Sequence, residues 1–164
     1  MKNFYTKKYF EERDALPEHL AQQIAFILKK HKAVKVLDVG SGTGKLVKFL
    51  NDESFQAIGV DSAKIAVEKY GAVFAKATNL PFSNSTFDAV LSISLIEHLE
   101  KLEAEKFLSE AARVLKKEGL IFLVTPNFAT PLRLIFGKKW FGYQDSTHKT
   151  FFTPGSLARM LETY

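Results

Sequence analysis

Apolar positions recur along the chain with two alternating spacings, one helical and one typical of buried strands. Two stretches show the helical spacing most clearly. The first, over about residues 15–31, carries apolar side chains at Leu16, Leu20, Ile24, Ile27 and Leu28. The second carries them at Ala104, Phe107, Leu108, Ala111, Val114 and Leu115. We expect Glu118 and Gly119 to end this second helix, since glycine commonly follows a helix C-terminus.

Short apolar runs between the helical stretches predict strands. They occupy residues 34–39, 55–60, 73–75, 87–93 and 120–124. Strands that alternate with helices pair in parallel through right-handed crossovers. The pattern therefore predicts an α/β fold, a doubly wound, mostly parallel, Rossmann-like sheet with helices on both faces. Ligands bind such sheets outside the carboxyl ends of the strands. Candidate site residues are thus expected at 38–44, 61–62, 76–82, 93–98 and 124–128.

The chain shows no repeat or linker, so we expect residues 1–164 to form one domain. Its predicted parts are an N-terminal helical cap (1–32), a cofactor-binding core (33–125), a lid that carries the acceptor (126–153) and a final helix (154–164). The lid is proline- and glycine-interrupted but rich in aromatic residues, which favours a folded cap over a disordered linker.

Composition narrows the range of partners. The chain has no cysteine, which excludes disulfides and thiolate chemistry and fits a reducing compartment. The first residues contain no apolar signal core, and no apolar run reaches membrane-spanning length. We therefore expect a cytoplasmic protein with no membrane partner. The net charge of +5 is spread over lysine-rich helix faces, which argues against a nucleic-acid partner.

The string VLDVGSGTGKL is the most informative part of the sequence. Glycines at 40, 42 and 44 let the backbone approach a ligand closely, and the following helix points free N–H groups at it. A dinucleotide fingerprint needs glycine where Lys45 stands, which makes a dehydrogenase a remote alternative. A Walker phosphate loop needs glycine at Val39 and serine or threonine at Leu46.

Asp61 ends the second predicted strand, about twenty residues after the glycine turn. A carboxylate at this place could accept both hydroxyls of a ribose. It could equally cap the helix that starts at Ser62. The two roles are compatible.

The strings VLDVGSGTG, AIGVD, ATNLPFSNSTFDAV, SISLIEHL and ARVLKKEGLIFLVTPN resemble, in order and spacing, the motifs of class I S-adenosylmethionine-dependent methyltransferases. The similarity covers residues 33–127 and is greatest to the small-molecule branch that includes ubiquinone-biosynthesis methyltransferases. It implies S-adenosylmethionine as the cofactor, S-adenosylhomocysteine as the product, and in-line methyl transfer to a small-molecule acceptor.

The resemblance also implies cofactor contacts. The methionine part would be flanked by Asp38, Gly40, Ser41, Gly42 and Gly44. The ribose and adenine would be bordered by Asp61, Ser62, Thr78, Asn79 and Leu80. The sulfonium and acceptor would lie next to Ser94, Leu95, Glu97 and His98.

Two departures from the family pattern stand out. Lys76 occupies a place where relatives carry an acidic residue that binds the adenine amino group. The chain also stops before the family's C-terminal hairpin, which indicates a fragment and leaves the fifth strand as an exposed edge that could pair with a second copy. Both departures motivate an alternative, a non-catalytic methyltransferase-like domain that serves in regulation or partner binding.

Candidate general bases are His98 and His148. The alternative for His98 is a surface residue at a helix start, and for the segment Asp145–Phe152 a loop that leads into the last helix. We expect no metal site, because the acidic and histidine residues show no regular ligand spacing. The aromatic residues Phe136, Trp140, Phe141 and Tyr143 could roof an apolar acceptor or pack on one another.

Overall fold

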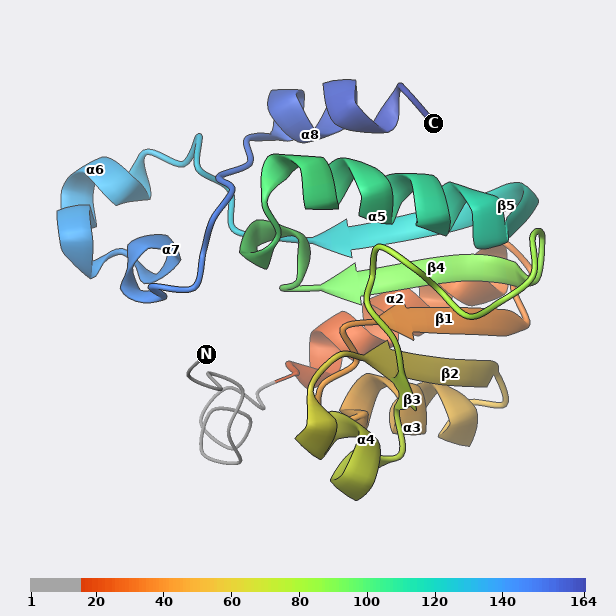
Figure 1. Cartoon of the computed structure of the whole chain (residues 1–164). Coiled ribbons are helices and arrows are strands. Elements are labelled where there is room, and N and C mark those ends of the chain that lie inside the picture. Colours follow the sequence, from red (N-terminus) through yellow and green to blue (C-terminus); the bar gives the residue numbers. More distant parts are fainter. Residues whose placement is uncertain (1–15) are drawn as a thin grey trace.

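The computed structural model describes residues 16–164 (Figure 1). Five parallel strands form one sheet in the order β3-β2-β1-β4-β5. Their bounds are β1 (Lys35–Val39), β2 (Gln56–Asp61), β3 (Val73–Phe74), β4 (Phe87–Ile93) and β5 (Leu115–Val124). The order reverses between β1 and β4, which confirms the predicted doubly wound sheet and places the crevice at the carboxyl ends of these two strands.

Helices connect the strands and cover the sheet. Their bounds are α2 (Glu18–Lys30), α3 (Lys45–Asp52), α4 (Lys64–Tyr70), η1 (Ile96–His98), α5 (Lys101–Val114), α6 (Leu132–Phe136), η2 (Gly137–Lys139), α7 (Phe141–Gln144) and α8 (Pro154–Leu161). Of the predicted N-terminal cap, residues 1–15 lie outside the described part of the chain. No helix in the described part is long and apolar enough to cross a membrane.

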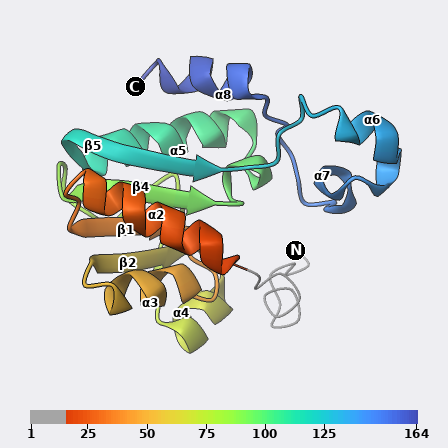
Figure 2. The same ribbon diagram turned by 180° about the vertical axis from the view of Figure 1, so that it is seen from behind.

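The central strand β1 is buried on both faces, which explains why Val36, Leu37 and Val39 are all apolar. Leu37 and Val39 pack in one cluster with α5, whereas Val36 packs in a second cluster with α2 and α3. The two clusters lie on opposite faces of the sheet because successive strand side chains alternate. Figure 2 shows α2 crossing one of these faces. The predicted three-layer arrangement is thus confirmed.

The prediction that Glu118 and Gly119 end the long helix is wrong. The helix α5 ends at Val114, and Leu115 already has extended backbone angles and pairs with Phe87 of β4. Glu118 has a φ of 62°, and the pairing register shifts before Ala89. Glu118 and Gly119 therefore form an irregularity inside β5. Two non-local contacts override the local helix-ending signal: Leu115 pairs with Phe87, and Lys116 forms an ion pair with Asp88.

The final helix is confirmed at α8. Its N-cap Thr153 forms a capping box with Ser156, and Pro154 stands in the first turn. Apolar residues of α8 pack on the cluster that contains α5. The Tyr164 hydroxyl donates a hydrogen bond to the backbone oxygen of Glu105 at 2.8 Å. Between β5 and α8 the chain leaves the sheet as α6, η2 and α7 (Figure 1).

Candidate functional site

The glycine turn joins the end of β1 to the N-terminus of α3. Gly40, Gly42 and Gly44 have φ angles of 79°, 52° and 70°, a left-handed backbone that side chains disfavour. A Cβ on Gly40 would also lie 3.1 Å from a methyl carbon of Leu95. The turn is therefore tight as well as left-handed, and it needs the glycines that the sequence places there.

Asp61 ends β2 directly across from this turn. Its Oδ2 accepts a hydrogen bond from the backbone N–H of Gly42 at 2.9 Å. Its Oδ1 accepts one from the backbone N–H of Ala63 at 2.7 Å, at the start of α4. One oxygen thus holds Ala63, the residue before α4 begins at Lys64 and not at Ser62, and the other is bonded to the glycine turn, so that the ribose role remains a prediction. Each oxygen keeps a second lone pair that can accept a ligand hydroxyl.

Asp38 lies at the floor of the crevice, near the end of β1. The side chain is 4% exposed. Burial, and then the negative charge of Asp61, raise the pKa of Asp38 from 3.8 to about 7. A cation that approaches a carboxylate desolvated in this way stabilises its charged form. The methionine end of S-adenosylmethionine, with its ammonium and sulfonium charges, has the required sign.

Gly59 is a functional position that the sequence reasoning missed. A Cβ at Gly59 would lie 2.5 Å from Oγ and 2.7 Å from Cβ of Ser41. Ser41 of the glycine turn therefore rests directly against the backbone of β2. A glycine inside a predicted strand was the available signal, because such glycines mark close approach of another segment.

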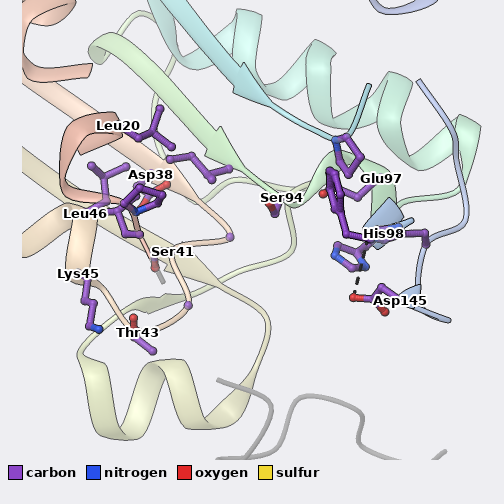
Figure 3. A pocket seen from close by; sticks show the side chains of 18 of the residues that line it. Leu20, Asp38, Ser41, Thr43, Lys45, Leu46, Ser94, Glu97, His98 and Asp145 are labelled. Carbon is purple, nitrogen blue, oxygen red and sulfur yellow. Dashed lines mark ion pairs between the residues drawn. The ribbon is translucent and has the colours of Figure 1, made fainter. Parts of the chain in front are cut away.

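A cleft of about 500 Å³ opens at the carboxyl ends of β1 and β4. Figure 3 shows Asp38 and Ser41 on one side of it and Glu97, His98 and Asp145 on the other, with Ser94 between them. The cleft is lined by both histidines and by four of the predicted methionine-side residues, Asp38, Gly40, Ser41 and Gly42, whereas Gly44 does not line it. Further lining residues, which lie outside the ranges expected at the strand ends, are Leu16, Pro17, Leu20, Lys45, Leu46 and Gln144.

The predicted adenine-side residues do not line this cleft. The Leu80 side chain is buried in the core, whereas Asn79 and Ser62 are exposed. The loop that carries Leu80 is clamped by α5: Leu80 N donates to Glu110 at 2.7 Å, and Arg113 donates to the backbone oxygens of Leu80 and Phe82 at 3.0 and 2.7 Å. These hydrogen bonds fix the backbone of the loop at Leu80 and Phe82. The adenine-binding roles of Ser62, Thr78, Asn79 and Leu80 remain predictions.

His98 is held by a short chain of hydrogen bonds. Thr147 Oγ1 donates its only hydrogen to Asp145 Oδ1 at 2.5 Å and lies 2.8 Å from His98 Nδ1. The hydroxyl must therefore accept from Nδ1–H, and the Thr147 carbonyl at 3.3 Å can accept from the same proton. We infer that the proton of neutral His98 sits on Nδ1, so that Nε2 carries the lone pair.

His148 shows the same tautomer by the same argument. Its Nδ1 lies 2.8 Å from the Gly142 carbonyl, which can only accept, so Nδ1 carries the proton. Its Nε2 lies 3.9 Å from Asp145 Oδ2. The rings of His98 and His148 are 4.8 Å apart, centre to centre. Two candidate bases that are far apart in the sequence thus share one corner of the cleft.

Glu97 completes this corner. Its side chain is 1% exposed, and burial raises its pKa above the usual range. Its Oε2 has no hydrogen-bond partner within the described residues. The ligand atoms of Glu97, His98 and His148 lie within 4.8 Å of one another, a set that could hold a divalent cation. The sequence predicted no metal site because its ligand spacing is irregular. The fold instead assembles the set by hydrogen-bonding Lys149 N and Thr150 N to the Glu97 carbonyl.

The aromatic residues of the predicted lid, residues 126–153, pack mainly on one another. Phe128 and Trp140 are buried, with ring centres 4.7 Å apart, and Tyr143 lies within 5.5 Å of both. Among the four residues considered as a roof, Phe141 lines the cleft. Self-packing therefore accounts for Trp140, and a contact with the acceptor remains a prediction for Phe141.

Comparisons with known proteins identify the family to which the chain belongs. Residues 9–164 match the family described as "Methyltransferase domain". The chain is 32% identical over 117 residues to the Methanocaldococcus jannaschii protein MJ0638, covering 67% of this chain and 50% of that protein. It is 27% identical over 155 residues to a ubiquinone biosynthesis O-methyltransferase of Bartonella bacilliformis, covering 84% of this chain and 62% of the relative.

Solved structures show the same fold. A SAM-dependent methyltransferase from Archaeoglobus fulgidus superimposes with a TM-score of 0.72 at 23% identity, covering 96% of this chain and 73% of that one. The chain spans about half the length of the curated relatives that it matches. With the family match over most of its length, the chain belongs to the methyltransferase domain family, whose membership implies S-adenosylmethionine as the cofactor.

Proposed function

We propose that the protein transfers a methyl group from S-adenosylmethionine to a small-molecule acceptor by in-line displacement. The observation that carries the proposal is the hydrogen bond from Gly42 N–H to Asp61, with the buried Asp38 beside it. Together they form a cradle that has a carboxylate for a ribose at one end and a desolvated carboxylate for a positive methionine group at the other.

The residues present fit the cofactor. Glycines 40, 42 and 44 leave the turn free of side chains. Asp61 has lone pairs available for ribose hydroxyls, and Asp38 supplies negative charge where the ligand is positive. When bound, the cofactor supplies an activated methyl group on a good leaving group. The protein's own contribution is to align the acceptor, exclude water and, where the acceptor needs it, remove a proton.

The acceptor would occupy the part of the cleft near His98 and His148. A volume of about 500 Å³ suits a small molecule. The inferred lone pair on Nε2 of either histidine could take a proton from a hydroxyl. Relatives named for ubiquinone and demethylmenaquinone methylation favour an aromatic acceptor, and a catechol is the simplest probe.

Binding of S-adenosylhomocysteine, measured by thermal unfolding, tests the cofactor site without needing an acceptor. At tenfold above Kd the ligand should raise the free energy of unfolding by about 1.4 kcal/mol. Asp61→Ala should abolish the increase. The matched control is Asp52→Ala, whose carboxylate pairs with Lys48 on the exposed side of α3.

Two outcomes would contradict the proposal. No stabilisation at millimolar S-adenosylhomocysteine would favour a non-catalytic domain. Stabilisation that Asp61→Ala leaves intact would remove the site assignment. Incubation with labelled S-adenosylmethionine and a catechol then tests methyl transfer itself, by mass spectrometry of the product.

A further inference from the structure

The segment between β5 and α8 exposes an unusual amount of apolar surface. We call residues 132–144, which contain α6, η2 and α7, the α6–α7 segment. Its exposed large apolar side chains are Leu132, Leu134, Ile135, Phe136, Phe141 and Tyr143. No residue of α6 is buried. Contiguous exposed apolar groups of this kind mark an interaction surface.

The exposed groups surround α6 instead of lying on one side of it. Leu134, Ile135 and Phe136 are consecutive, and consecutive residues of an α-helix point about 100° apart. Leu134 and Ile135 are 76% and 73% exposed. A flat protein partner would cover one side of such a helix and leave the others wet. A lipid leaflet surrounds a projecting helix from all sides, and Figure 1 shows α6 and α7 projecting away from the sheet.

The segment has its own internal packing, which does not use these exposed apolar groups. Trp140 and Phe128 are buried against each other at 4.7 Å, edge to face. Gly142 packs so closely under Trp140 that a Cβ there would meet the indole ring. His148 Nδ1–H donates a hydrogen bond to the Gly142 carbonyl and so holds Gly142 in this position. The buried side chains of the segment are thus packed on one another, and its exposed apolar side chains are available to a partner.

Charge identifies the partner. Residues 126–144 contain Arg133, Lys138 and Lys139 and no acidic residue, so three positive charges accompany the exposed apolar groups. Lysine is depleted from the cores of protein interfaces. Beside inserted apolar side chains, however, basic residues contact anionic headgroups and place their charges in the interfacial layer.

We propose that the α6–α7 segment docks the protein on the surface of an anionic lipid bilayer. Leu134, Ile135 and Phe136 enter the boundary between headgroups and acyl chains, and Lys138 and Lys139 contact the headgroups. Since Phe141 and Gln144 also line the cleft, docking places the acceptor end of the cleft beside the bilayer. The expectation of no membrane partner rested on the lack of an apolar signal core and of an apolar run of spanning length, and peripheral docking requires neither.

Vesicle co-sedimentation tests the proposal and needs no methyl transfer, so its result is independent of the proposed reaction. The whole chain should pellet with phosphatidylcholine vesicles that contain phosphatidylglycerol, and less with phosphatidylcholine alone or at high salt. Leu134→Ser with Ile135→Ser should lower the partition coefficient at least about tenfold. The matched control is Leu102→Ser on α5, where the side chain is 71% exposed.

The charge contribution is measured separately with Lys138→Glu and Lys139→Glu, each of which should weaken binding to anionic vesicles about fivefold or more. An unchanged melting temperature shows that the variants remain folded. A second measurement uses the absence of cysteine: Ile135→Cys labelled with an environment-sensitive dye should shift its emission to the blue on anionic vesicles.

Three results would overturn the proposal. The first is no binding of the unmodified chain to anionic vesicles. The second is equal loss of binding in Leu102→Ser and in the α6 variant. The third is self-association by analytical ultracentrifugation that Leu134→Ser with Ile135→Ser abolishes while vesicle binding is absent, because a second copy would then be the partner.

Discussion

The backbone N–H of Gly42 donates a hydrogen bond to Asp61 Oδ2 at 2.9 Å, which ties the turn after β1 to the end of β2. Two segments 19 residues apart in the sequence are thus held next to each other. The same turn contacts β2 a second time, because the Ser41 side chain packs against the backbone of Gly59. Backbone packing therefore shapes the cradle in addition to the two carboxylates.

Gly59→Ala should damage this cradle. A Cβ placed 2.5 Å from Ser41 Oγ must displace the glycine turn, and we expect a loss of about 1–3 kcal/mol in the free energy of unfolding. Affinity for S-adenosylhomocysteine should fall with it, as measured by calorimetry. Ser41→Gly in the same chain removes both closest atoms and should restore part of the loss. Gly155→Ala, whose Cβ would have no neighbour closer than 3.8 Å, should change neither quantity.

The sheet and the cradle could be predicted from sequence because their signals are local. Strand β4 lies at the predicted residues, since a short apolar run that is interrupted only by Asp88 and Ser92 and bounded by turn residues has few alternatives. Gly42 and Asp61 could be paired before the structure because parallel strand ends meet at one edge. Glu118 and Gly119 were misassigned because Leu115 pairs with Phe87, a contact that no local pattern encodes.

The corner formed by Glu97, His98 and His148 lay beyond sequence reasoning for a similar reason. About fifty residues separate the two histidines, and the backbone bonds from Lys149 and Thr150 to Glu97 bring them together. A loop-to-loop contact of this kind leaves no periodic signal. Glu97, His98 and His148 could each be named in advance, whereas their shared position came from the structure.

Asp38 should make the ligand-free protein less stable as the pH rises. Its pKa is raised from 3.8 to about 7, so the folded state binds a proton in this range that the unfolded state has released. The free energy of unfolding should therefore fall between about pH 4 and pH 7. Asp38→Asn should remove this fall and stabilise the protein at pH 8 by about 2–4 kcal/mol.

The same variant should bind S-adenosylhomocysteine poorly, since the negative charge is lost. Urea denaturation across pH, followed by calorimetry at pH 8, measures both effects. An Asp38→Asn protein that binds the ligand as well as the unmodified protein would show that the charge has another role. Asp52→Asn, an exposed carboxylate of α3, is the matched control and should alter neither stability nor binding.

Arg113 should determine the order of the loop that borders the adenine side. Its guanidinium bonds to Glu110 and to the carbonyls of Leu80 and Phe82. The hydrogen bond with Arg113 lowers the pKa of Glu110, so this stabilisation is present above the usual glutamate pKa and lost as the pH falls below it. Arg113→Ala should cost about 1–3 kcal/mol, measured by urea denaturation at pH 7.

Arg113→Lys should recover little of this loss, because lysine lacks the planar fork that reaches two carbonyls. Hydrogen exchange should increase at the amides of residues 79–82, where the clamp acts. The control is Lys48→Ala, which removes an exposed ion pair with Asp52 and should cost less than about 0.5 kcal/mol. Equal costs for the two alanine variants would show that the clamp contributes no more than a surface pair.

Thr147 should position His98 for proton removal from the acceptor. Its hydroxyl accepts from His98 Nδ1–H because it donates to Asp145, which leaves Nε2 as the basic nitrogen. Thr147→Val keeps the shape and removes this bond. We expect kcat to fall about tenfold with KM for S-adenosylmethionine unchanged, because the cofactor cradle is untouched. Thr147→Ser should restore the rate. The ¹⁵N chemical shifts of His98 should report Nδ1–H in the unmodified protein and a tautomer mixture in Thr147→Val. A slower variant with an unchanged tautomer would rule out this positioning role.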